Sequence, residues 1–157
     1  MTPAQADQAV ALFREYFRRG GKEENQLYPG IPELLRALKD AGKNLVLATS
    51  KPEEFARETM AHFGLDQFIT QIAGATMDRA RTTKGAVIAY AMERFQIGPS
   101  TAVMVGDREY DILGAKEHGI PAIGVTFGYG SREELEQAGA IATAASPEAL
   151  QKLLLGE

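Results

Sequence analysis

Short, uniformly apolar segments alternate with helical patterns through the middle and end of the chain, and this alternation strongly constrains the fold. The apolar segments are Leu45–Ala48, Ala102–Val105 and Ala122–Val125, with a weaker one near Phe68–Ala73. Amphipathic patterns separate them, such as residues 83–95, where apolar side chains recur at helical spacing. Strands that are apolar on both faces and separated by helices are typical of a parallel sheet with helices on both sides. We therefore predict a doubly wound α/β domain.

The first 29 residues do not follow this alternation. Apolar side chains between Ala9 and Phe17 recur at helical spacing, and two glycines at positions 20 and 21 follow this stretch. The α/β pattern begins only after the segment Tyr28-Pro29-Gly30. We predict a helical segment with a linker at residues 1–29 and an α/β core at residues 30–157.

Composition excludes several classes of function. The chain of 157 residues has 17 basic and 21 acidic side chains, a net charge of −4, and no basic run, which argues against nucleic-acid binding. It has no cysteine, so disulfides and thiol catalysis are excluded. No apolar run approaches the roughly 18 residues of a membrane helix, and the first residues lack a signal-peptide profile. We predict a cytoplasmic protein with no nucleic-acid or membrane partner.

Polar residues directly after the predicted strands are the candidates for a functional site, because ligands bind beyond the carboxyl ends of strands in open α/β sheets. Thr49 and Ser50 follow the first strand, Asp107 and Asp111 follow the second, and Lys84 opens the helix between them. Two carboxylates suit a hard cation such as Mg²⁺. Hydroxyl, backbone amide and ammonium groups suit a phosphate.

Each of these residues also has a purely structural interpretation. The Thr49 hydroxyl could cap a helix that begins at Pro52. Asp111 could be a helix N-cap and Asp107 a turn residue, while Lys84 could be a solvated surface lysine. Local sequence alone leaves these alternatives open.

The order of these residues resembles the haloacid dehalogenase (HAD) superfamily, and most of all its phosphoglycolate-phosphatase-like branch. The resemblance rests on Thr49, Lys84 and the Gly106-Asp107-x-x-x-Asp111 group on successive elements. It extends over residues 28–35, 48–52, 105–116 and 124–131. Such a resemblance implies a HAD-like Rossmannoid core and Mg²⁺-dependent hydrolysis of a small phosphorylated metabolite through an aspartyl-phosphate intermediate.

The resemblance also implies a role for each residue. Thr49 and Ser50 would bind the phosphate, and Lys84 would stabilise its charge, so that Thr49 and Lys84 are the catalytic residues. Asp107 would be the Mg²⁺ ligand, and Asp111 would support the ion directly or through water.

Two assignments around this site have competing interpretations. Arg81 is close enough to Lys84 in the sequence to take its role. The Gly128-Tyr129-Gly130 loop is expected to border the entrance, but we expect its glycines to supply positive φ angles for a turn.

The sequence departs from the family in one respect. Family members carry the nucleophile and its acid/base partner in a D-x-D-x-T/V stretch on the first strand, and this sequence has no such stretch. The helix of residues 1–29 resembles a remnant of the family's helical cap, so we expect a truncated HAD core that lacks its first strand. We expect a phosphatase with little or no turnover, or alternatively a non-catalytic module that binds phosphate and Mg²⁺. The strands before Thr49 and before Asp107, which flank the first strand in the family, would pair directly. Otherwise a second copy or a missing N-terminal segment would complete the sheet.

Overall fold

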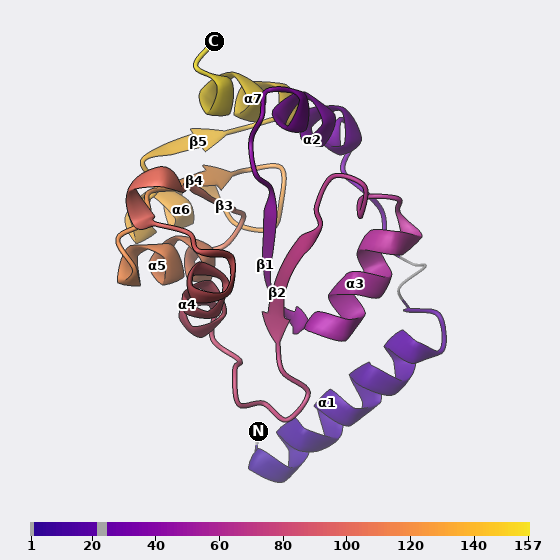
Figure 1. Cartoon of the computed structure of the whole chain (residues 1–157). Helices are drawn as coiled ribbons and strands as arrows, with labels where there is room; N and C mark the ends of the chain where they lie inside the picture. Colours follow the sequence, from indigo (N-terminus) through magenta and orange to yellow (C-terminus); the bar gives the residue numbers. More distant parts are fainter. Residues whose placement is uncertain (1, 22–24) are drawn as a thin grey trace.

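The computed structural model describes residues 2–21 and 25–157 as an α/β fold of parallel strands and helices (Figure 1). The helices are α1 (Pro3–Arg18), α2 (Ile31–Asp40), α3 (Glu53–His62), α4 (Lys84–Phe95), α5 (Glu109–Glu117), α6 (Arg132–Ala138) and α7 (Pro147–Leu155). The strands are β1 (Val46–Pro52), β2 (Gln71–Ala75), β3 (Met104–Gly106), β4 (Ala122–Val125) and β5 (Ala142–Ala144). The predicted doubly wound α/β class is confirmed.

The strands form two parallel sheets rather than one. One sheet has the order β1-β2, with Leu47 opposite Ile72, and the other has the order β3-β4-β5, with Val105 opposite Ile123. The expectation that the strands before Thr49 and before Asp107 pair directly is therefore wrong. Within residues 2–21 and 25–157, β1 pairs only with β2 and β3 only with β4, so the other edge of each strand has no strand partner there.

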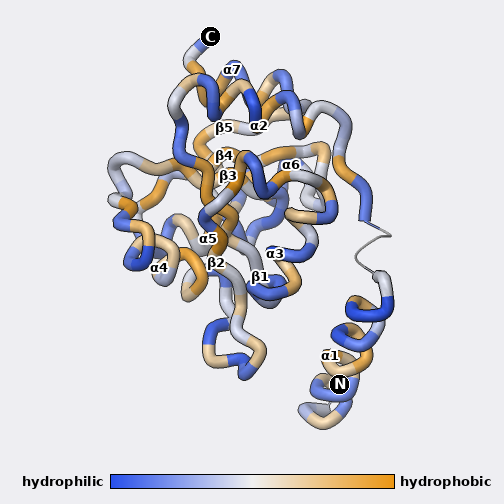
Figure 2. Tube along the Cα trace, turned by 45° about the vertical axis from the view of Figure 1, so that its right-hand side comes forward, coloured by the Kyte–Doolittle hydropathy of each residue, from blue (hydrophilic) through white to orange (hydrophobic). Residues whose placement is uncertain are grey.

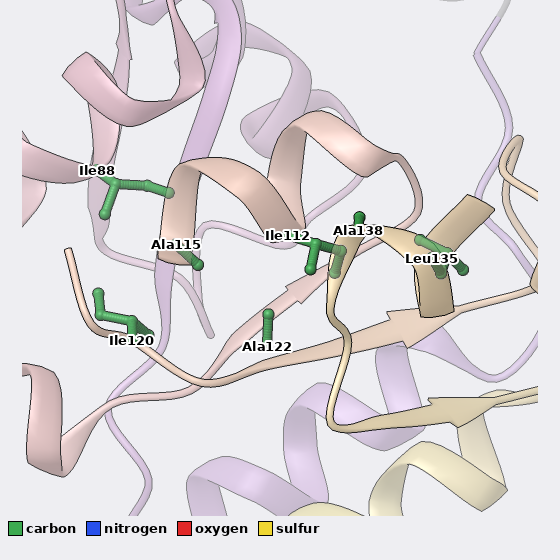
Figure 3. Close-up of a cluster of buried hydrophobic side chains, with 7 residues drawn as sticks. All are labelled: Ile88, Ile112, Ala115, Ile120, Ala122, Leu135 and Ala138. Carbon is green, nitrogen blue, oxygen red and sulfur yellow. The ribbon is translucent and has the colours of Figure 1, made fainter. Parts of the chain in front are cut away.

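Helices cover both faces of the three-stranded sheet, as the apolar strands predict. Ala122 of β4 belongs to a core cluster with residues of α4, α5 and α6 (Figure 3). The neighbouring Ile123 and Val125 pack on the opposite side with α2, α7 and β5. Successive side chains of a strand point to opposite faces, so an all-apolar strand requires a helix layer on each side.

Helix α4 joins the two sheets. Val87 and Ala91 pack with Ala73 of β2. Ile88, one residue further along the helix than Val87, belongs to the same core cluster as Ile112 and Ala115 of α5 (Figure 3). This helix begins at Lys84. The residue before it, Thr83, is the N-cap, and its hydroxyl accepts a hydrogen bond from the Ala86 backbone N–H. The packing of α4 therefore places Lys84 at the junction between the sheets.

Helix α1 lies beside the α/β core rather than within it (Figures 1 and 2). Its one buried residue, Phe17, stacks on Phe55 of α3, with the ring centroids 4.5 Å apart. Arg14 donates a hydrogen bond to the Met77 carbonyl oxygen at 2.9 Å. None of the helices in residues 2–21 and 25–157 is long and apolar enough to cross a membrane.

Candidate functional site

An ion pair between Lys84 and Asp111 lies at the centre of the candidate site. Lys84 Nζ is 2.8 Å from Asp111 Oδ1 and also donates to the Ala48 carbonyl oxygen at 3.0 Å. Both charged side chains are nearly buried, with 13% and 10% of their surfaces exposed. Lys84 thus connects Ala48 within β1, one residue before Thr49, with the first turn of α5.

The second oxygen of Asp111 holds the backbone between β3 and α5. Oδ2 accepts hydrogen bonds from the backbone N–H groups of Asp107, at 3.0 Å, and Arg108, at 3.1 Å. A carboxylate in the first turn also interacts favourably with the positive end of the helix dipole. The N-cap of α5 is Arg108, so the interpretation of Asp111 as the N-cap is wrong. Asp111 is the third residue of the helix, where it accepts hydrogen bonds from the backbone before the helix and pairs with Lys84 as well.

Thr49 and Ser50 lie within β1, which extends to Pro52, so the prediction that the strand ends before them is wrong. The Thr49 hydroxyl accepts a hydrogen bond from the Lys51 backbone N–H at 3.1 Å. Helix α3 starts at Glu53 after Pro52, with no side-chain cap, so the alternative that Thr49 caps this helix is wrong. Ser50 is exposed.

Lys84 and Arg81 contact different groups. Arg81 Nε donates to the Gly74 carbonyl oxygen at 2.8 Å, and its guanidinium lies 3.5 Å from the Tyr90 ring centroid. Arg81 Nη2 also lies 3.4 Å from Glu53 Oε2. These contacts hold Arg81 between β2, α3 and α4, whereas Lys84 is the cation beside Asp111.

The loop Gly128–Gly130 closes over Asp107. Asp107 Oδ2 accepts a hydrogen bond from the Tyr129 backbone N–H at 2.9 Å, and the Gly130 N–H donates to the Asp107 carbonyl oxygen at 2.8 Å. The expectation of positive φ angles is wrong, since neither glycine of this loop adopts one. A Cβ on Gly128 would lie 2.4 Å from Asp107 Cβ, so close approach explains the glycines.

Gly130→Ala is expected to destabilise the protein by about 1–3 kcal/mol, because the added methyl would lie 2.2 Å from the Asp107 carbonyl oxygen. The comparison is Gly98→Ala, where φ is −88° and the nearest atom is 3.6 Å away. That change should stay within about 0.5 kcal/mol. Urea unfolding of both variants measures the difference, and equal midpoints would contradict the close-approach explanation.

The donor set at this site is compatible with a Mg²⁺ ion that keeps several waters. Asp107 Oδ1 has no hydrogen-bond partner among the described residues, whereas both oxygens of Asp111 are occupied. Residues 2–21 and 25–157 contain no group of three or more potential ligands among His, Cys, Asp and Glu. Mg²⁺ is commonly held by only one or two carboxylates together with water and phosphate oxygens.

Three residues near Asp107 were not identified from the sequence. Arg108 pairs with Glu134 at 2.8 Å, and this contact raises the pKa of Arg108 and lowers that of Glu134. Tyr28 packs edge-on against Phe127, and burial together with the nearby Tyr129 and Asp107 raises its pKa. Tyr28 lies far from Asp107 in the chain, so no local pattern associates the two.

Comparison with known proteins identifies the family of this chain. Residues 2–125 match the model of the haloacid dehalogenase-like hydrolase family. A 5'-nucleotidase from Pseudomonas aeruginosa is 43% identical over 132 residues, and a phosphoglycolate phosphatase from Vibrio vulnificus is 33% identical over 128. A solved structure described as a predicted phosphatase from Clostridium acetobutylicum superposes on the whole chain with a TM-score of 0.97 and 43% identity.

The matched proteins are longer than this chain. The matched region covers 84% of the chain but 60% of the Pseudomonas protein, and 82% of the chain but 56% of the Vibrio protein. The Clostridium structure is covered to 73% of its length. Together with the parallel α/β fold, the family match over most of the chain shows that this protein belongs to the haloacid dehalogenase-like hydrolase family.

Proposed function

We propose that this chain carries the site of a Mg²⁺-dependent phosphatase that acts on small phosphomonoesters. The observation that carries the proposal is the nearly buried Lys84–Asp111 pair, which holds an ammonium group between Ala48 of β1 and the start of α5. A fixed cation at this position can stabilise the charge of a phosphoryl group in a poorly hydrated environment. The names of the Vibrio and Pseudomonas relatives support a phosphomonoester as substrate.

The roles follow from the contacts of each side chain. Thr49 and Ser50 would bind phosphoryl oxygens, and Lys84 would offset their charge. Asp107 would hold the Mg²⁺ ion, and Asp111 would orient both Lys84 and the Asp107 backbone. When bound, Mg²⁺ would supply further neutralisation of the phosphoryl group.

We further propose that this polypeptide is impaired in turnover. Its sequence has no D-x-D-x-T/V stretch to provide the carboxylate nucleophile of the family. Among the described residues, one edge of β1 and one edge of β3 have no strand partner, and this is compatible with completion of the sheet by a further strand from a second copy or another segment. A non-catalytic module that retains phosphate and Mg²⁺ binding is the alternative.

The test combines binding with turnover. Calorimetry measures Mg²⁺ binding in the presence of inorganic phosphate, and a second assay measures phosphate released from a panel of small phosphomonoesters. Asp107→Asn should weaken Mg²⁺ binding at least about tenfold, since it removes the ligand charge. Asp66→Asn, an exposed acidic position outside the site, should bind Mg²⁺ like the parent.

The outcomes distinguish the proposed Mg²⁺ and phosphate site from the proposed impairment of turnover. Binding without release above the Asp107→Asn background supports an impaired phosphatase site. Release that disappears in Asp107→Asn would show that the chain is active and would overturn the proposed impairment. Equal Mg²⁺ binding by the parent and Asp107→Asn, or no binding by either, would overturn the proposed site.

A further inference from the structure

One side of α5 faces the first turn of α4, where Lys84 begins the helix. Asp111, Gly114 and His118 lie on this side, because residues three and four positions apart share one face of a helix. Asp111 pairs with the Lys84 ammonium. Gly114 and His118 contact the part of α4 from which the Lys84 side chain extends.

Gly114 allows Lys84 to lie close against α5. A Cβ on Gly114 would lie 2.9 Å from Lys84 Cγ and 3.0 Å from the Gly85 backbone nitrogen. Both distances are shorter than close-packed side chains keep, so the absence of a Cβ leaves the space that the Lys84 stem occupies. The start of α4 and the middle of α5 are therefore in direct contact.

His118 holds the same turn of α4 by a hydrogen bond. Its Nε2 lies 2.8 Å from the Gly85 carbonyl oxygen. A carbonyl oxygen only accepts hydrogen bonds, so Nε2 carries the proton and donates. The bond joins the C-cap of α5 to the residue directly after Lys84, and the proposed function does not use it.

The ammonium of Lys84 has three N–H groups, and two of them have partners. One donates to Asp111 Oδ1 and another to the Ala48 carbonyl oxygen. Within residues 2–21 and 25–157, no partner takes the third. Because the lysine stem is flexible, the direction of this third N–H depends on how firmly the backbone of Lys84 is held.

We infer that His118 is a positioning residue for Lys84. Its hydrogen bond to Gly85 holds the first turn of α4 on α5 and keeps the third N–H of Lys84 available for a phosphoryl oxygen. The inference rests on the proposed function, which places a phosphoryl group beside Lys84. A cation that is already held in position stabilises a phosphoryl group better than one that must first be ordered.

The first test measures how firmly Lys84 is held, without any ligand. Trace acetylation followed by mass spectrometry gives the reactivity of Lys84 relative to the exposed Lys43. His118→Leu removes the donor, so this relative reactivity should rise about fivefold, the scale of one lost hydrogen bond. His118→Gln keeps an amide donor of similar reach and should stay within about twofold of the parent.

The second test measures the binding of inorganic phosphate by calorimetry in the presence of Mg²⁺. His118→Leu should bind phosphate about fivefold more weakly than the parent, and His118→Gln should bind it within about twofold.

Two control variants separate positioning from a general loss of stability. Leu150→Val weakens the core cluster that includes residues of α2 and α7, and should keep both parent values. His62→Leu, at an exposed histidine that ends α3, is the matched histidine control and should also keep them.

Failure of the inference differs from failure of the proposed function. Equal Lys84 reactivity in the parent and His118→Leu would overturn the inference, as would an equal rise in His118→Gln or Leu150→Val. Phosphate binding that is the same in the parent and His118→Leu would also overturn it, while the phosphate site would stand. If the parent binds no phosphate with Mg²⁺, the proposed function fails, and the inference fails with it.

Circular dichroism checks that His118→Leu is folded. If it is not, His118→Asn replaces it in both tests, because the shorter amide ends before the position of Nε2. The same rise in reactivity and the same loss of phosphate affinity are expected, and parent values in this variant would overturn the inference.

Discussion

Asp111→Ala is expected to lower the free energy of unfolding by about 3–5 kcal/mol, because it leaves the ammonium of Lys84 nearly buried and unpaired. The change also removes the acceptor for the backbone N–H groups of Asp107 and Arg108. Loss of a charged acceptor adds to the cost of the unpaired charge. Equilibrium unfolding in urea measures the effect.

A double-variant cycle separates the contribution of the Lys84–Asp111 ion pair from that of the hydrogen bonds between Asp111 and the backbone. Adding Lys84→Met to Asp111→Ala should restore part of the lost stability, because the unpaired ammonium is then gone. Glu136→Ala is the surface control, since its pair with Arg132 is exposed and 3.9 Å long and should contribute less than about 0.5 kcal/mol. A loss below about 1 kcal/mol in Asp111→Ala would show that Lys84 finds another partner.

Phe17→Ala is expected to release α1 from the core. Phe17 is 2% exposed and is the one buried residue of this helix among those described. Truncation of a buried phenylalanine costs about 3–5 kcal/mol. The other described contacts of α1 with the core include the Arg14 hydrogen bond to Met77 and the exposed pair of Asp7 with Arg79. We therefore expect α1 to open locally while the sheets stay folded.

Limited trypsin digestion measures this opening, because Arg14 and Arg18 lie within α1. An opening free energy reduced by about 3 kcal/mol corresponds to a rate of cleavage more than about 100-fold faster. Leu12→Ala, in the same helix but 59% exposed, should be cleaved at nearly the parent rate. Equal rates in the two variants, or simultaneous loss of the core, would contradict local release.

Two elements were not predicted from the sequence, and each has a physical reason. The strand Ala142–Ala144 consists of alanine and threonine, and lacks the large apolar residues that mark the other strands. Its place in the sheet depends on pairing with β4, where Ile123 lies opposite Ala142. Helix α2 follows the segment Tyr28–Gly30, and its buried Leu34 and Leu38 pack with Leu150 of α7, more than a hundred residues away.

The candidate site was predictable in part. The positions of Asp107 after a strand and of Lys84 and Asp111 in the first turns of helices follow from chain order, because strand ends in an α/β sheet converge. Thr49 lies within β1, since that strand extends past the apolar segment to Pro52. The close contact of Gly130 with Asp107 was not predictable, since a glycine in a loop is more often explained by its φ angle. The roles of these residues in binding and turnover stay predictions.

The sequence by itself determined the class of fold and the order of the polar residues along it, because apolar periodicity and helix signals act over short stretches of chain. Only the tertiary structure decided that β1 and β3 belong to separate sheets, and that Lys84 rather than Arg81 meets Asp111. It also decided that Lys51 lies against Phe17. These contacts join segments tens of residues apart, and their geometry depends on how helices pack on sheets, which no local pattern encodes.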